Sequence, residues 1–66
     1  MIKTLTLKDA AAKLRENGMR ISDRSLAAGL EQGAYPFGIC IRMDGERVFQ
    51  IFGVLLDAWI AERTGK

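Results

Sequence analysis

The side chains of this chain that could do chemistry are arginines and small polar residues. Its 66 residues include one cysteine and no histidine, which excludes an internal disulfide, a cysteine-rich zinc site and a histidine base. The carboxylates are scattered along the sequence and form no acid–base pair. We therefore expect a binding protein and not an enzyme, with no metal, no cofactor and no small-molecule substrate.

Arg24 is the strongest candidate for a residue that recognises a partner. It belongs to a series that lies outside the apolar face of its helix, consisting of Ser22, Arg24, Ser25, Ala28 and Gln32. An arginine donates two parallel hydrogen bonds to the acceptors of guanine in the major groove of DNA. Two other interpretations stay open: Ser22 only caps the helix, and Arg24 is a solvated surface charge.

A second candidate group is the arginine pair Arg42 and Arg47, which flanks an Asp-Gly dipeptide. A two-residue turn at that dipeptide places the two arginines directly opposite each other, where like charges repel. Either a phosphate partner accounts for this pair, or Asp44 and Glu46 neutralise it.

The charge distribution points to the first third of the chain. The 10 basic and 8 acidic residues give a net charge of +2. Residues 1 to 24 contain six basic and three acidic side chains, and the rest of the chain contains four and five. Lys13, Arg15 and Arg20 belong to this positive part, and we expect them to contact phosphates. The alternative is a charged helix face that is only solvated.

Two short helices are needed to position the first of these groups. Thr6 precedes an apolar stripe and predicts a helix over residues 7–16. Ser22 predicts the start of a second helix, which Gly33 ends. Two short helices with a brief connection, the second opened by serine, form the pattern of a helix-turn-helix.

A hairpin is needed to position the arginine pair. An Asp-Gly dipeptide between β-branched and aromatic segments is the strongest short hairpin signal, and it pairs Met43 with Glu46. Strand alternation puts Ile39, Ile41 and Val48 on one face, and puts Cys40, Arg42, Arg47 and Phe49 on the other.

Residues 52–63 predict a third helix with one apolar stripe. None of these elements is stable alone, so we expect one domain over residues 1–66. The fold class is α+β, mainly α: a winged helix-turn-helix in the order helix, helix, β-hairpin, helix. The predicted core consists of Leu7, Ala11, Leu14, Ile21, Leu26, Leu30, Phe37, Ile41, Val48, Ile51, Leu55, Leu56, Trp59 and Ile60.

The sequence also suggests a compartment. No apolar stretch approaches the roughly 20 residues that span a bilayer, and the amino-terminal residues lack the apolar region of a signal peptide. With a single cysteine as well, we expect a cytoplasmic protein with no membrane partner.

Several segments in this order resemble one known family. Residues 7–14, LKDAAAKL, look like the opening helix of the excisionase-like, MerR-related winged helix-turn-helix proteins. The turn and second helix of that family are similar to residues 21–22 followed by 24–26, and the resemblance continues through residues 31–33, 35–38 and 56–63. The chain departs from the family in the middle of the second helix, where Ala27 and Ala28 replace longer polar residues.

The resemblance implies a small double-stranded DNA-binding protein of a phage or mobile element. It further implies an excisionase-type recombination directionality factor, which reads the major groove with its second helix and contacts the backbone or minor groove with its hairpin. Its partners would be a tyrosine recombinase (integrase) or copies of itself on adjacent sites. The alternatives are a small transcription regulator on the same scaffold and a protein–protein adaptor, such as a phage accessory protein, that does not bind DNA. The DNA-binding residues would be Lys13, Arg15, Arg20, Ser22, Arg24, Ser25, Ala28, Gln32, Arg42 and Arg47.

Overall fold

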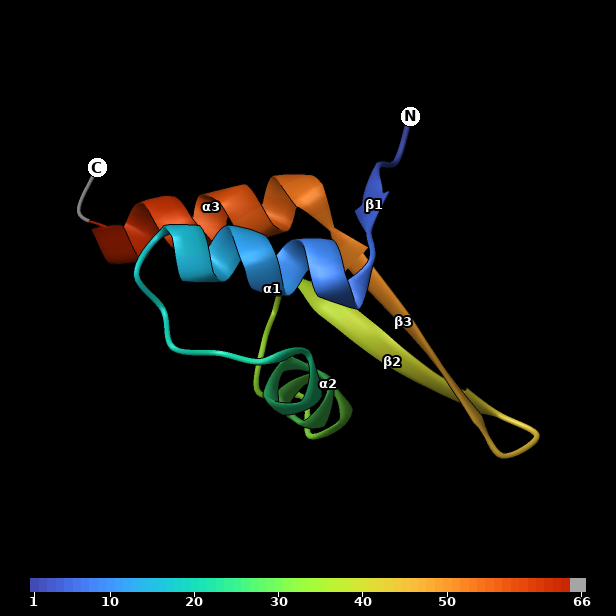
Figure 1. The fold of residues 1–66 in the computed structure, drawn as a ribbon. Helices are drawn as coiled ribbons and strands as arrows, with labels where there is room; N and C mark the ends of the chain where they lie inside the picture. Colours follow the sequence, from blue (N-terminus) through green and yellow to red (C-terminus); the bar gives the residue numbers. More distant parts are fainter. Residues whose placement is uncertain (65–66) are drawn as a thin grey trace.

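The structure is a computed structural model that describes residues 1–64 (Figure 1). Three helices and a three-stranded antiparallel sheet follow in the order β1, α1, α2, β2, β3, α3, with the strands arranged β1-β3-β2 across the sheet. The elements are β1 (Thr4–Leu5), α1 (Leu7–Glu16), α2 (Asp23–Glu31), β2 (Gly38–Met43), β3 (Glu46–Phe52) and α3 (Gly53–Thr64). The α+β class and the order helix, helix, hairpin, helix are confirmed, and β1 is an addition that the sequence did not predict.

Both predicted helix starts are confirmed, because a side chain caps each of them. The hydroxyl of Thr6 accepts a hydrogen bond from the backbone N–H of Asp9 at 3.1 Å, and α1 covers the predicted range. At α2, the Ser22 hydroxyl accepts from the N–H of Ser25 at 3.1 Å, and the Ser25 hydroxyl accepts from the N–H of Ser22 at 2.9 Å. This reciprocal pair satisfies two amide groups that a helix start otherwise leaves free.

The hairpin has the predicted register. Met43 lies opposite Glu46, and Arg42 lies opposite Arg47. Asp44 and Gly45 form the turn with φ angles of 49° and 81°. Positive φ at both central residues matches the right-handed twist of the strands that the turn joins.

The prediction of which hairpin face is buried was wrong. Ile39, Ile41 and Val48 are 46%, 41% and 38% exposed, while Ile51 is fully buried. Val48 and Ile51 are three residues apart in one strand, so they point to opposite faces and only one of them can be in the core. Ile51 packs against the helices because α2 covers the face that Gly38 and Ile51 share.

The third helix begins one residue later than predicted. Phe52 is the last residue of β3 and pairs with Thr4 of β1, and α3 starts directly at Gly53. Leu56 is fully buried, but Leu55 is exposed, which corrects its place in the predicted core. Adjacent helical residues point about 100° apart, and α3 is oriented so that Leu56 faces the core while Leu55 faces solvent.

The core lies where the three helices meet the inner face of the sheet. Phe37 is fully buried, stacks on Tyr35 at a ring-centroid distance of 5.1 Å, and contacts Trp59 edge to face at 5.2 Å. Leu7, Trp59 and Ile60 are only partly buried at the border of the core. The buried residues are Ala10, Ala11, Leu14, Ile21, Leu26, Ala27, Leu30, Phe37, Ile51 and Leu56.

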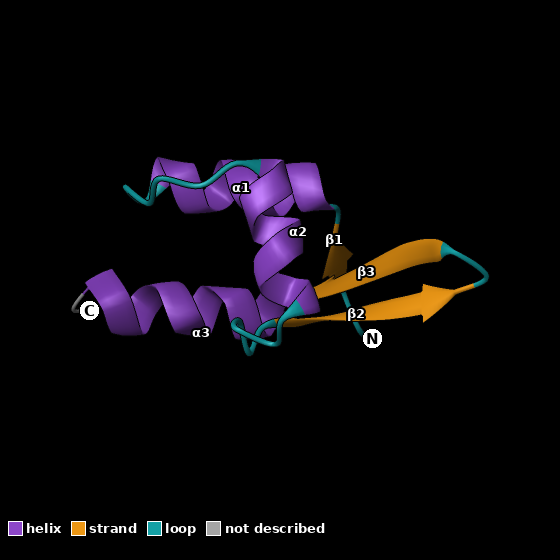
Figure 2. Cartoon of the chain, turned by 90° about the horizontal axis from the view of Figure 1, so that it is seen from below, coloured by secondary structure: helices purple, strands orange, loops and turns teal. Residues whose placement is uncertain are grey.

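The hairpin extends beyond the helical layer in both ribbon views (Figures 1 and 2). Helices α1 and α3 run in the same general direction, and α2 crosses between them (Figure 2). The ion pair between Lys13 of α1 and Asp57 of α3, at 2.5 Å, ties the two outer helices together. Within residues 1–64, no helix is long and apolar enough to cross a bilayer.

Candidate nucleic-acid interface

One side of α2 is open to solvent and carries the residues predicted to read DNA. Arg24, Ala28 and Gln32 are exposed, and they are spaced four residues apart, so they follow one side of the helix. The opposite side supplies Leu26, Ala27 and Leu30 to the core. Within residues 1–64, the side chains of Arg24 and Gln32 make no hydrogen bond or ion pair.

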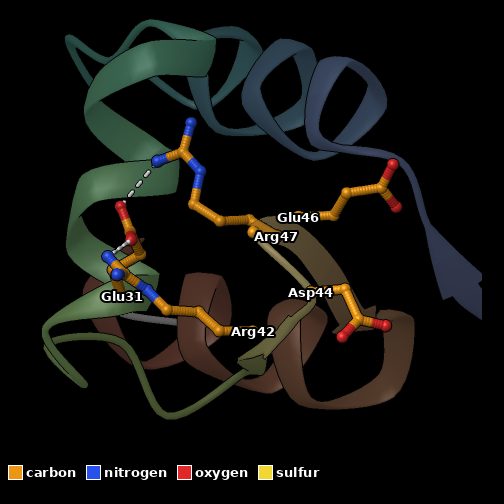
Figure 3. Close-up of a pocket in the computed structure, with 6 residues that line it drawn as sticks. Glu31, Arg42, Asp44, Glu46 and Arg47 are labelled. Carbon is orange, nitrogen blue, oxygen red and sulfur yellow. Dashed lines mark hydrogen bonds and ion pairs between the residues drawn. The ribbon is translucent and has the colours of Figure 1, made fainter.

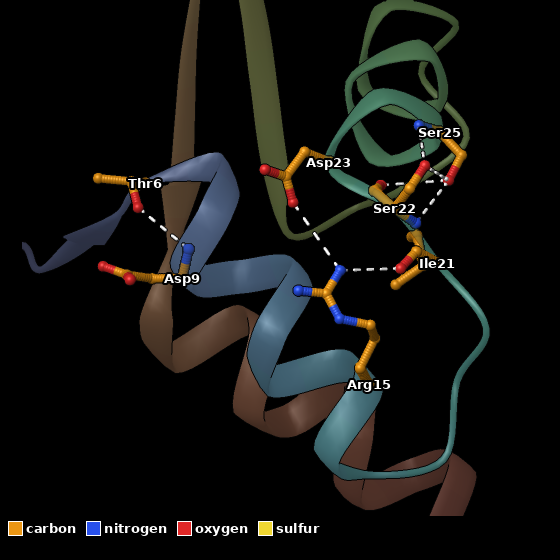
Figure 4. A network of polar contacts seen from close by, with 7 residues as sticks. All are labelled: Thr6, Asp9, Arg15, Ile21, Ser22, Asp23 and Ser25. Carbon is orange, nitrogen blue, oxygen red and sulfur yellow. Dashed lines mark hydrogen bonds and ion pairs between the residues drawn. The ribbon is translucent and has the colours of Figure 1, made fainter.

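The two serines at the start of α2 are occupied with capping (Figure 4). Their hydroxyl oxygens lie 3.0 Å apart, and the Ser25 hydroxyl also donates to the Ser22 carbonyl at 3.1 Å. Both hydroxyls therefore already have partners within the chain. Ser22 and Ser25 therefore fix the helix start, where the positive end of the helix dipole lies.

Arg15 joins α1 to the connection before α2 (Figure 4). Its Nη1 donates to the carbonyl of Ile21 at 3.0 Å and lies 3.8 Å from a carboxylate oxygen of Asp23. Lys13 is likewise paired with Asp57. Two of the predicted phosphate contacts are thus engaged within the chain, although both side chains remain partly exposed.

Arg20 and Arg24 remain available on either side of the Ser22 cap. Both are exposed, and neither forms an ion pair with any residue among 1–64. The end of α2 where the dipole is positive therefore carries two uncompensated guanidinium groups. That combination attracts phosphate groups.

The arginine pair of the hairpin is bound by Glu31, the last residue of α2 (Figure 3). Arg42 donates to one carboxylate oxygen and Arg47 donates to the other, the latter at 2.6 Å. The side chain of Glu31 is 18% exposed, whereas those of Arg42 and Arg47 are 75% and 50% exposed. The single carboxylate of Glu31 is thus the counter-charge that both arginines share, and within residues 1–64 neither pairs with Asp44 or Glu46, which were one of the two alternatives from the sequence.

This contact shifts the pKa values of Glu31 and Arg42. The hydrogen bonds from Arg42 and then Arg47 lower the pKa of the Glu31 carboxyl below its ordinary value of 4.5. The hydrogen bond to Glu31 raises the pKa of the Arg42 guanidinium. Glu31 was not among the predicted site residues. The sequence does contain one indication of such a counter-charge, because two arginines directly opposite each other are expected to repel.

A cavity of about 480 Å³ opens beside this contact and is lined by Glu31, Arg42, Asp44, Gly45, Glu46 and Arg47. Asp44 and Glu46 point away from the Glu31 carboxylate (Figure 3), and neither forms an ion pair within the described part of the chain. Three carboxylates and two guanidinium groups leave this cavity with a net negative charge. A phosphate group would therefore approach the outward side of the arginines and not the cavity itself.

The ten predicted residues fall into three groups. The first group lies along α2 and just before it, and consists of Arg20, Ser22, Arg24, Ser25, Ala28 and Gln32. The second group is Arg42 and Arg47, which adjoin the last turn of α2 through Glu31. The third group, Lys13 and Arg15, lies on α1. No family model, curated protein or solved structure matches the chain.

Proposed function

We propose that the chain binds double-stranded DNA as a winged helix-turn-helix, with α2 in the major groove and the β2–β3 hairpin as the wing. The observation that carries the proposal is the uncompensated charge of Arg20 and Arg24 beside the open side of α2. These arginines supply electrostatic attraction to phosphates, and the open side supplies surface that can reach base edges.

The size and composition of α2 support insertion into a groove. An α-helix with its side chains is about 10–12 Å across, which fits the major groove of about 12 Å width, and the nine residues of α2 give about 14 Å of helix length along which contacts can form. Arg24 lies near the helix start, where recognition helices contact bases. Ala28 is small enough for the helix to approach closely, and the Gln32 amide can donate to and accept from adenine.

The hairpin fits the role of a wing that contacts the DNA backbone. Glu31 holds Arg42 and Arg47 against the last turn of α2, yet each guanidinium group retains N–H donors that Glu31 does not use. The acidic turn with Asp44 and Glu46 would be repelled by phosphates, so the wing contributes through its arginines. The affinity of one copy is correspondingly modest.

The biological role that we propose is that of an excisionase-type recombination directionality factor in the cytoplasm. This part depends on the resemblance of residues 7–14, 21–22, 24–26, 31–33, 35–38 and 56–63 to that family. The resemblance suggests binding next to a tyrosine recombinase or beside further copies of the same chain. A small transcription regulator would use the same surface of α2.

An adaptor that binds another protein is the second candidate. It is favoured by an apolar hollow of about 420 Å³, which is lined by Met1, Ile2, Lys3, Phe52, Val54 and Leu55. Ile2 and Val54 are largely exposed in it, and exposed apolar surface of this kind contributes to protein contacts.

A salt titration of duplex binding separates these two functions. Fluorescence anisotropy with a labelled duplex should show log affinity falling linearly with log salt, with a slope of about −4 for four to five phosphate contacts. An adaptor that binds through the hollow would show little salt dependence for its protein partner. If no duplex binds even at low salt, the DNA-binding proposal is wrong.

A further inference from the structure

We infer that the free edge of β2 pairs with the β2 of a second copy of this chain, and that the two sheets join across a twofold axis. The strand order β1-β3-β2 leaves β2 at the border of the sheet. The hairpin extends away from the helices in both views (Figures 1 and 2). This inference does not depend on DNA binding.

The alternation of backbone hydrogen bonds between β2 and β3 shows which backbone N–H and C=O groups of β2 are free at this edge. The N–H of Phe52 donates to the carbonyl of Phe37 at 2.9 Å, so Phe37 directs its polar backbone groups toward β3. The orientation alternates along an antiparallel strand, so Ile39, Ile41 and Met43 also face β3. The N–H and C=O groups of Gly38, Cys40 and Arg42 face outward.

These outward groups have no partner among residues 1–64. Apart from the ladder with β3, no backbone hydrogen bond within that range involves residues 38–43. A free strand edge with this many unpaired donors and acceptors is a template for another strand.

Protective features that soluble proteins place on such edges are lacking in β2. The strand contains no proline and no lysine, and its continuous pairing from Gly38 to Met43 leaves no bulge. Its one charged side chain, Arg42, is held toward α2 by Glu31. The edge is therefore open to pairing.

One register suits a pair of identical strands best. When Cys40 lies opposite Cys40 of the second copy, Gly38 lies opposite Arg42 of that copy, and all three outward residues of each strand enter the new ladder. The two Arg42 side chains are then about 13 Å apart along the strands, beyond the screening length of about 8 Å at physiological salt. A register with Arg42 opposite Arg42 would place like charges together.

The same register pairs apolar side chains on the outer face. Ile39 of each copy lies opposite Ile41 of the other, at the closer, non-hydrogen-bonded positions of the new ladder. Both isoleucines are exposed in the single chain, and β-branched cross-strand pairs stabilise a sheet. Charge and apolar side chains therefore favour one and the same alignment.

The contact is small, which determines its strength. A ladder of five residues is about 16 Å long, so it covers far less than the roughly 800 Å² per partner of a stable interface. We expect a dimer in rapid exchange, with a dissociation constant of about 0.1–1 mM.

The test combines sedimentation with amide hydrogen exchange over a range of protein concentrations. We expect reversible association, with the amides of Gly38, Cys40 and Arg42 exchanging about three- to eightfold more slowly at about 3 mM protein, where about two thirds to nine tenths of the chains would be paired. The amides of Ile39 and Ile41 already donate to β3 and should change little.

A matched pair of variants locates the contact. Ile41→Lys and Val48→Lys add the same charge on the same sheet face, but only Ile41 belongs to the edge strand. Ile41→Lys should abolish association, whereas Val48→Lys should retain it. Four results would overturn the inference: no association up to about 3 mM, association without added protection of the three outward amides, association that survives Ile41→Lys, or association that Val48→Lys abolishes as well.

Discussion

Arg42 and Arg47 lie directly opposite each other in the β2–β3 hairpin, and both donate to the same carboxylate, that of Glu31. The contact converts a repulsive cross-strand pair into a connection between the hairpin and the last turn of α2. Because these are the two elements proposed to contact DNA, one carboxylate sets how the wing is placed relative to the recognition helix.

Replacing Glu31 with Gln should destabilise the protein at neutral pH. The substitution keeps the size of the side chain but leaves Arg42 and Arg47 opposed without a counter-charge. We expect a lower Tm in thermal unfolding followed by circular dichroism. Glu16→Gln is the matched control, because Glu16 is exposed and forms no ion pair with residues 1–64. Equal Tm values for the two variants would contradict the role of Glu31.

The stability that Glu31 contributes should also depend on pH. Its folded-state pKa is lowered by Arg42 and Arg47, so its contribution is fully present above the ordinary value of 4.5 and is lost as the pH falls through the folded pKa. The difference in Tm between the natural chain and Glu31→Gln should therefore shrink below about pH 4.5. A difference that stays constant down to about pH 2 would contradict the assignment.

Arg24→Ala should weaken binding to a specific duplex by about 1–3 kcal/mol, or roughly 5- to 150-fold. The reason is that Arg24 is exposed, unpaired within residues 1–64 and near the start of α2. Lys3→Ala removes the same charge near the amino terminus, which lies across α1 from α2 in Figure 1, and should have a much smaller effect. Fluorescence anisotropy at one fixed salt concentration measures both. Equal losses would show that only net charge matters.

Asp44→Asn should strengthen duplex binding if the hairpin turn lies near phosphates. Asparagine tolerates the positive φ of 49° at this position, and an Asn-Gly turn keeps the hairpin intact. Removing one negative charge at close range should raise affinity by up to about fivefold at low salt. Unchanged affinity at low salt would place the turn away from the DNA.

Gly29→Ala should destabilise the fold, although alanine is the better helix former by about 1 kcal/mol. A Cβ on Gly29 would lie 2.2 Å from Cε2 of Tyr35, and that ring is held by Phe37 and Trp59. We expect a net loss of about 1–2 kcal/mol in the free energy of unfolding, measured by urea denaturation.

A double-mutant cycle with Tyr35→Ala provides the control for this clash. In the background without the ring, Gly29→Ala should become neutral or stabilising. The same loss in both backgrounds would show that Tyr35 is not the cause.

The local elements were predictable because their signals lie within a few residues of one another. Thr6 and Ser22 act on amides three residues ahead, and the Asp44-Gly45 turn determines the register of the residues beside it. The buried face of the hairpin was not predictable from alternation. Ile39, Ile41 and Val48 form as regular an apolar series as a core strand, and only the position of α2 decides against them.

The candidate site likewise has one part that local sequence signals predict and another part that depends on packing. The open side of α2 follows from helical spacing alone, so Arg24, Ala28 and Gln32 were correctly expected to face outward. The partner of the arginine pair was missed, since Glu31 is 11 residues from Arg42 and 16 from Arg47. Contacts of that kind are created by the packing of α2 on the sheet, which no local pattern specifies.

The short strand β1 has a kinetic consequence. Thr4 and Leu5 pair with Phe52 and Ile51 from the far end of the chain, whereas the hairpin closes around a local turn and can form within about 10 µs. The third strand can be added only after residues 4–5 reach residues 51–52, at the cost of closing a loop of most of the chain. Refolding should therefore finish at β1, and partial unfolding should begin there.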